Sequence, residues 1–145
     1  MATILVINGP NINLLGTREP HIYGEKTMDE INFGLEEVAR SRGVQIEFFQ
    51  SNHEGHLVDC IQAARNRVDC IVINAGALTH YSIALHDALR AAELPVIEVH
   101  ISNPYAREEF RHRSYISPIA VGGIFGFGPL SYRLAVEMAI QLVKS

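Results

Sequence analysis

His100 lies near the end of the apolar run PVIEVHI (95–101), and Glu98 stands two positions before it. Residues two apart in a strand share a face, so the Glu98 carboxylate could orient the His100 imidazole. Imidazole changes its charge near neutral pH, which suits it to proton transfer. The alternative is a hydrogen-bonded histidine with a purely structural role at the end of a buried strand. The pair makes His100 a candidate acid–base residue.

The stretch NGPNINLLGTREPHIYG (8–24) directly follows the apolar run TILVI, and it carries Asn11, Arg18 and Tyr23. In an α/β protein, the loop after the first strand is where a ligand usually binds. This loop has neither a dinucleotide nor a phosphate pattern, and it has no Ser or Thr before Thr17. A flavodoxin-like module that binds FMN is therefore a weaker hypothesis than an enzyme with its active site in this loop. Taken singly, Arg18 could be a solvated charge and Tyr23 a packing residue.

Polar side chains also follow the other apolar runs. The run CIVINA (70–75) leads to His80 and contains Asn74, while PVIEVHI leads to Ser102, Arg107 and Arg111. Ligands of open parallel sheets bind beyond the carboxyl ends of the strands, so these residues are expected to converge with the 8–24 loop. A surface run of ion pairs is the alternative for the two arginines, because Glu108 and Glu109 lie between them.

Several motifs fail as metal, phosphate or redox sites. His53 and His56 lack the HExxH spacing and an obvious third ligand, so no metal is expected. The segment GFGP (126–129) lacks the Lys and hydroxyl of a phosphate loop, and it is interpreted as a turn. Cys60 and Cys70 have no CxxC spacing and are expected to be reduced packing residues.

The elements that would position these residues alternate between strands and helices. Strands are predicted at 3–8, 44–50, 70–75, 95–101 and 117–124, and helices near 27–43, 54–67, 82–93 and 130–144. Thr27 and Glu30 form a capping box, and Ser82 caps the third helix. Three of the strands are nearly continuous apolar runs, which is typical of parallel strands buried on both faces. We predict a flavodoxin-like α/β three-layer sandwich with a five-stranded parallel sheet of order 2-1-3-4-5.

Length and composition limit the class of protein. With 145 residues, 48% of them hydrophobic and 19% charged, the chain is expected to form one catalytic domain over 1–145. The net charge of −4, with acids and bases interleaved, argues against a nucleic-acid partner. No signal peptide and no apolar run of membrane-spanning length is recognised, so we expect a cytoplasmic protein without membrane contact.

The combined motifs resemble those of type II 3-dehydroquinate dehydratases (type II dehydroquinases). The resemblance runs nearly from end to end and is carried by ILVINGPNINLLGTREPHIYG, SNHEG, IVINAGALTHYSIALHDAL, VIEVHISNPYAREEFRHRSYISP and GFGPLSYRLA. It implies conversion of 3-dehydroquinate to 3-dehydroshikimate and water by anti elimination through an enolate. The reaction serves the shikimate pathway of aromatic amino acid biosynthesis or quinate breakdown. The resemblance also implies a homododecamer of four trimers, and no metal or organic cofactor.

The resemblance also implies a role for each site residue. Tyr23 is the base, and because a free phenol ionises only near pH 10, Arg18 supplies positive charge with support from Arg107. His100 protonates the departing hydroxyl with Glu98 fixing its tautomer, and Asn11 helps to hold the enolate oxygen. The expected substrate-binding residues are Asn74, His80, Asp87, Ile101, Ser102 and Arg111, with Asp87 reaching into a neighbouring subunit.

Three further expectations follow from the resemblance. Gly16, Pro20 and Gly24 suit a lid that closes over the substrate. Lys26 and Lys144, the only lysines, are poor candidates for the Schiff base of the unrelated type I enzymes. The complete set of expected acid, base and oxyanion groups argues against an inactive homologue kept for assembly. Arg113, His56 and Cys60 depart from common family residues outside the proposed chemistry.

Overall fold

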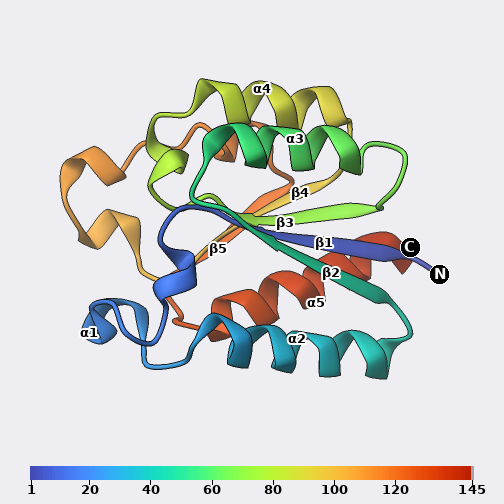
Figure 1. The fold of residues 1–145 in the computed structure, drawn as a ribbon, viewed down its shortest axis with the longest axis horizontal. Helices are drawn as coiled ribbons and strands as arrows, with labels where there is room; N and C mark the ends of the chain where they lie inside the picture. Colours follow the sequence, from blue (N-terminus) through green and yellow to red (C-terminus); the bar gives the residue numbers. More distant parts are fainter. Residues whose placement is uncertain (145) are drawn as a thin grey trace.

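The computed structural model describes residues 1–144 as an α/β sandwich of three layers (Figure 1). Its parallel sheet has the strand order β2-β1-β3-β4-β5, which confirms the predicted fold class and topology. The strands are β1 (Thr3–Asn8), β2 (Gln45–Gln50), β3 (Cys70–Asn74), β4 (Val96–His100) and β5 (Gly122–Phe125). Helices α2 (Met28–Arg42) and α5 (Leu130–Lys144) cover one face, and α3 (Glu54–Ala64) and α4 (Ile83–Ala92) cover the other.

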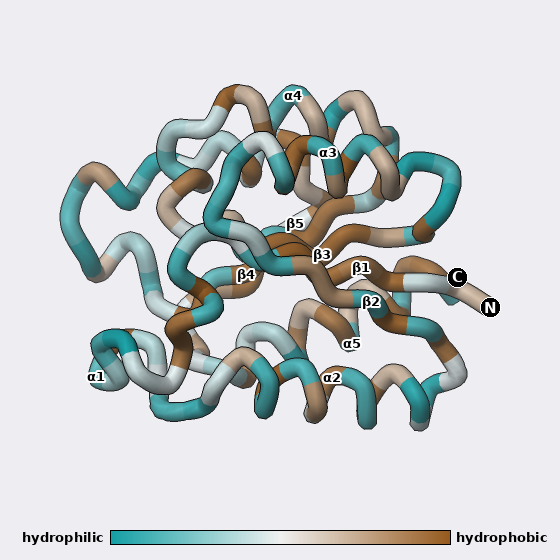
Figure 2. Tube along the Cα trace, in the orientation of Figure 1, coloured by the Kyte–Doolittle hydropathy of each residue, from teal (hydrophilic) through white to brown (hydrophobic). Residues whose placement is uncertain are grey.

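The central strands are apolar along their length because both of their faces are buried. In β1, Ile4 and Val6 pack with α2 and α5, whereas Leu5 and Ile7 pack with α3 and α4. The hydropathy colouring follows this arrangement, with brown concentrated along the inner strands and teal on the outer parts of the helices (Figure 2). The edge strands β2 and β5 are more exposed.

The helix ends follow the signals read from the sequence. The Thr27 hydroxyl accepts the Glu30 N–H while the Glu30 carboxylate accepts the Thr27 N–H, so the capping box is confirmed. Gly43 ends α2 at φ 70°, a backbone conformation that favours glycine. Ser82 caps α4 by accepting the Leu85 N–H. No helix among residues 1–144 is long and apolar enough to cross a membrane.

The strand predicted at 117–124 is wrong over its first half. Ser117–Ile119 forms the 3-10 helix η5, and β5 occupies Gly122–Phe125. Pro118 has no N–H to donate to a sheet, and the Ser114 hydroxyl accepts the N–H groups of Ile116 and Ser117. Pairing with β4 begins only where the Val121 N–H reaches the Val96 carbonyl.

Other elements also differ in detail from the expected ranges. Helix α3 ends at Ala64 rather than near residue 67. The expected 16–24 lid contains the short helix α1 (Pro20–Tyr23), which starts with proline at its first position, where no backbone donor is needed. The lid segment is thus partly helical, and Tyr23 is its last helical residue.

Candidate active site

A cavity of about 620 Å³, including its open mouth, lies at the carboxyl ends of β1, β3 and β4. Ten of the residues predicted from the sequence line it: Asn11, Arg18, Tyr23, Asn74, His80, His100, Ile101, Ser102, Arg107 and Arg111. The expected convergence of the loop and strand ends is therefore what the structure shows.

Two predicted residues lie outside the cavity lining. Glu98 is buried and contacts His100. Asp87 lies on the exposed side of α4, one turn after the exposed Ile83, and its own chain's cavity does not include it. The structure also adds Pro10, Gly76 and Ala77, whose backbone and small side chains have no chemical signature in a sequence.

Tight backbone packing brings the ends of β1 and β3 together. Asn8 and Asn74 are register partners, and the Gly9 N–H donates to the Asn74 carbonyl at 2.8 Å. A Cβ at Gly9 would lie 2.4 Å from the Ala75 carbonyl oxygen, so no larger residue fits without a backbone shift. Glycine at this position allows Asn11 and Asn74 to line the same cavity.

Two guanidinium groups, from segments distant from each other in the sequence, lie over the Tyr23 ring. The Cζ atom of Arg18 is 4.8 Å from the centre of the Tyr23 ring, and that of Arg107 is 5.2 Å from it. The Tyr23 side chain is buried, which strengthens these electrostatic interactions relative to water. The Arg107 guanidinium also donates to the Ser102 hydroxyl at 3.2 Å, linking the lid tyrosine to the segment after β4.

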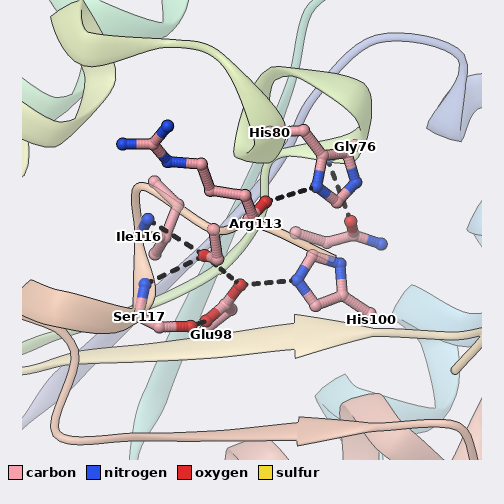
Figure 3. A network of polar contacts seen from close by, with 9 residues as sticks. Gly76, His80, Glu98, His100, Arg113, Ile116 and Ser117 are labelled. Carbon is pink, nitrogen blue, oxygen red and sulfur yellow. Dashed lines mark hydrogen bonds and ion pairs between the residues drawn. The ribbon is translucent and has the colours of Figure 1, made fainter. Parts of the chain in front are cut away.

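Glu98 holds His100 and the 114–117 segment at once (Figure 3). The His100 Nε2–H donates to Glu98 Oε2 at 2.6 Å, and the Ser114 hydroxyl donates to the same oxygen at 2.8 Å. The Ser117 hydroxyl donates to Glu98 Oε1. Nδ1 is therefore the His100 ring nitrogen left for the cavity. Sequence reasoning missed both serines, because their distance along the chain from Glu98 follows no motif.

Burial alone would raise the pKa of the Glu98 carboxyl. The hydrogen bond and charge of His100, followed by the hydroxyls of Ser117 and Ser114, outweigh burial and hold that pKa below its ordinary value. Glu98 is thus an anion at neutral pH, able to accept the hydrogen bond from His100.

His80 stacks on His100 with ring centres 6.4 Å apart, and its Nδ1–H donates to the Arg113 carbonyl at 2.8 Å. Burial is the main reason that the pKa of His80 lies below its ordinary value of 6.5, with His100 and Arg111 lowering it further. The bond to the Arg113 carbonyl opposes this effect without cancelling it. His80 is therefore a neutral hydrogen-bonding group in the cavity at neutral pH.

The described residues give no support to a metal site or to a phosphate-binding loop. Within residues 1–144, no group of three or more His, Cys, Asp or Glu side chains is arranged to hold a metal ion. Thr17 carries the first hydroxyl of the opening loop, and it donates to the Leu14 carbonyl. It is thus engaged within the loop instead of facing a phosphate.

The lowered pKa values of His80 and Glu98 predict that the free energy of unfolding decreases in two stages as the pH is lowered. Neutral His80 contributes fully above pH 6.5, the ordinary value, and its contribution is lost as pH falls below it. Ionised Glu98 contributes fully above pH 4.5, and its contribution is lost as pH falls further. Urea unfolding followed by circular dichroism from pH 8 to 3.5 measures both stages. We expect Glu98→Gln to remove the lower stage; a stability that is flat or rises on acidification would contradict the assignment.

Comparison with known proteins places the chain in one family. Residues 2–140 match the dehydroquinase class II family. The chain is 58% identical over 135 residues to 3-dehydroquinate dehydratase 2 of Pseudomonas aeruginosa, covering 93% of this chain and 91% of that protein. It is 52% identical over 145 residues to catabolic 3-dehydroquinase 2 of Neosartorya fischeri, covering 100% of this chain and 97% of the relative.

Solved structures give the same result. Type II dehydroquinase from Butyrivibrio crossotus superposes with a TM-score of 0.92 at 47% identity, over 94% of this chain and 96% of that one. The corresponding enzyme from Propionibacterium acnes superposes with a TM-score of 0.93 at 44% identity, over 97% of each chain. With nearly the whole chain matched in sequence and in fold, this protein belongs to the dehydroquinase class II family.

Proposed function

We propose that Tyr23 and His100 are the base and the acid of a 3-dehydroquinate dehydratase. The reaction is that of a hydro-lyase: 3-dehydroquinate loses water to give 3-dehydroshikimate, in the shikimate pathway or in quinate breakdown. The observation that carries the residue assignment is the meeting in one cavity of an arginine-flanked phenol and a carboxylate-held imidazole.

The first step is removal of a proton from the carbon next to the ketone. Tyrosinate at position 23, stabilised by Arg18 and Arg107, takes this proton and leaves an enolate. The Asn11 side chain lines the same cavity and, through a water molecule, stabilises the enolate oxygen. Arginine suits this environment because it stays charged and does not compete for the proton.

The second step is loss of the β-hydroxyl by anti elimination. Doubly protonated His100 donates a proton from Nδ1 to the departing oxygen while Glu98 keeps Nε2–H in place. Tyr23 then carries a proton and His100 lacks one, so transfer through solvent restores both groups and no net proton is consumed. Asn74, His80, Ile101, Ser102 and Arg111 hold the carboxylate and hydroxyls of the substrate.

The assembly we propose is a homododecamer of four trimers, with one catalytic domain per chain. An apolar groove beside the edge strand β5 is lined by exposed side chains, among them Val121, Phe127, Leu134 and Met138, and it supports burial against other subunits. The exposed position of Asp87 on α4 fits the proposal that it reaches a neighbouring site. Light scattering measures the number of subunits, and a monomer would contradict the proposal.

We place the protein in the cytoplasm. Both cysteines are free thiols, as expected in a reducing compartment. Burial raises the pKa of the Cys70 thiol to about 12, so this group is unreactive at neutral pH.

The activity is tested by adding purified protein to 3-dehydroquinate with excess chelator. We expect the ultraviolet absorbance of a conjugated enone to appear at the same rate with and without chelator. Borohydride added during turnover should leave no substrate adduct, since the mechanism forms no imine. The absence of enone would refute the activity, whereas an adduct would refute the enolate mechanism alone.

A further inference from the structure

Tyr132 lies in the first turn of α5, on the side of the sheet covered by α2 and α5, and is 1% exposed. Its hydroxyl reaches the ends of two neighbouring strands. It donates to Asn8 Oδ1 at 2.5 Å and accepts from Asn74 Nδ2 at 2.9 Å. Asn8 and Asn74 are register partners on β1 and β3, so a helix near the end of the chain contacts the floor of the cavity.

The direction of these two hydrogen bonds is fixed. Burial raises the pKa of the Tyr132 hydroxyl well above its ordinary value of 10, so the group stays a neutral phenol with a single proton to donate. Asn8 Oδ1 is an acceptor and receives that proton. The phenol oxygen is then left as the acceptor for Asn74.

The other side of the Asn74 amide is also engaged. Asn74 Oδ1 accepts the Gly76 N–H at 3.1 Å. Rotating the amide by 180° would place its oxygen against the phenol oxygen and its NH₂ against the Gly76 N–H, giving two repulsive pairs. One orientation of the amide is therefore strongly favoured. In it, one N–H and one lone pair remain for a ligand in the cavity that Asn74 lines.

We propose that Tyr132 is a positioning residue, which orients the Asn74 amide for substrate although it does not line the cavity itself. The inference rests on the proposed function, since it assigns Asn74 a contact with 3-dehydroquinate. Pre-orienting a polar group avoids the cost of ordering it when the substrate binds. Loss of the hydroxyl should thus weaken substrate binding more than it slows the chemical step.

The chain offers a matched control one residue away. Ser131 is fully buried in the same turn of α5, and its hydroxyl accepts the Phe127 N–H at 3.0 Å. It makes a structural hydrogen bond that does not involve the cavity-lining Asn74. Ser131→Ala and Tyr132→Phe each remove one buried hydroxyl, so a purely structural effect should appear in both variants.

The test is steady-state kinetics with 3-dehydroquinate on wild type, Tyr132→Phe, Ser131→Ala, Asn74→Ala and the double variant Asn74→Ala/Tyr132→Phe. We expect Tyr132→Phe to raise KM about 3- to 10-fold with kcat changed less than about 2-fold, as for one lost hydrogen bond in substrate binding. Ser131→Ala should leave KM unchanged. The double variant should match Asn74→Ala, because the phenol acts through that amide.

An unchanged KM in Tyr132→Phe, or independent effects in the double variant, would overturn the inference. If Tyr132→Phe does not fold, Asn8→Ala serves in its place, since it removes the acceptor that orients the phenol; its KM should rise, and an unchanged KM would overturn the inference equally. Wild-type protein without turnover would refute the proposed function and the inference together, whereas active wild type with unaltered KM in the variants would refute the inference alone.

Discussion

Tyr23→Phe is expected to lower kcat by about 10²- to 10⁴-fold, the usual contribution of a general base. Phenylalanine keeps the aromatic ring beside Arg18 and Arg107 and removes only the oxygen that would take the proton. The KM should change little, because the cavity keeps its shape and its other polar groups. Enone formation over a range of substrate concentrations measures both constants.

The control for this variant is Tyr115→Phe. The Tyr115 ring also lies beneath a guanidinium, with the Arg113 Cζ 4.7 Å from the ring centre, but Tyr115 does not line the cavity. Its kcat should match that of the wild type. Near-normal kcat in Tyr23→Phe would show that another group removes the proton.

His100→Asn is expected to lower the rate of elimination by a similar factor, about 10²- to 10⁴-fold, while proton removal continues. The variant retains Tyr23 and its two arginines, so the enolate still forms and returns to substrate. In D₂O, deuterium should therefore enter the substrate at the carbon next to the ketone without loss of water. Proton NMR of the recovered substrate measures this exchange.

Deuterium exchange into the substrate distinguishes the roles of Tyr23 and His100, since Tyr23→Phe should lose both exchange and elimination. His53→Asn is the control, because His53 is exposed and lies outside the cavity. It should retain the wild-type rate of elimination. A His100→Asn variant that neither exchanges nor eliminates would mean that His100 is needed for the first step, contrary to its proposed role as the acid for the second.

The sequence alone predicted the strands, the helices and most of the residues that line the cavity because the signals involved are local, while the strand order followed from the commonest arrangement of five such units. Apolar runs mark strands buried on both faces, and capping residues mark helix starts, so the carboxyl ends of β1, β3 and β4 could be found residue by residue. The pairing of Glu98 with His100 was predictable for the same reason, since residues two apart share a strand face. The family resemblance then assigned a role to each residue.

Only the tertiary structure showed the contacts that join distant segments. Ser114 and Ser117 hold Glu98, and Tyr132 orients Asn74, in each case between residues far apart in the sequence. The start of β5 was mispredicted for a related reason, because the Ser114 hydroxyl takes the Ile116 and Ser117 N–H groups that a strand would have paired. Hydrophobic periodicity records which face of an element is buried. The partner that a buried polar group finds depends on how those elements pack, and no local pattern encodes it.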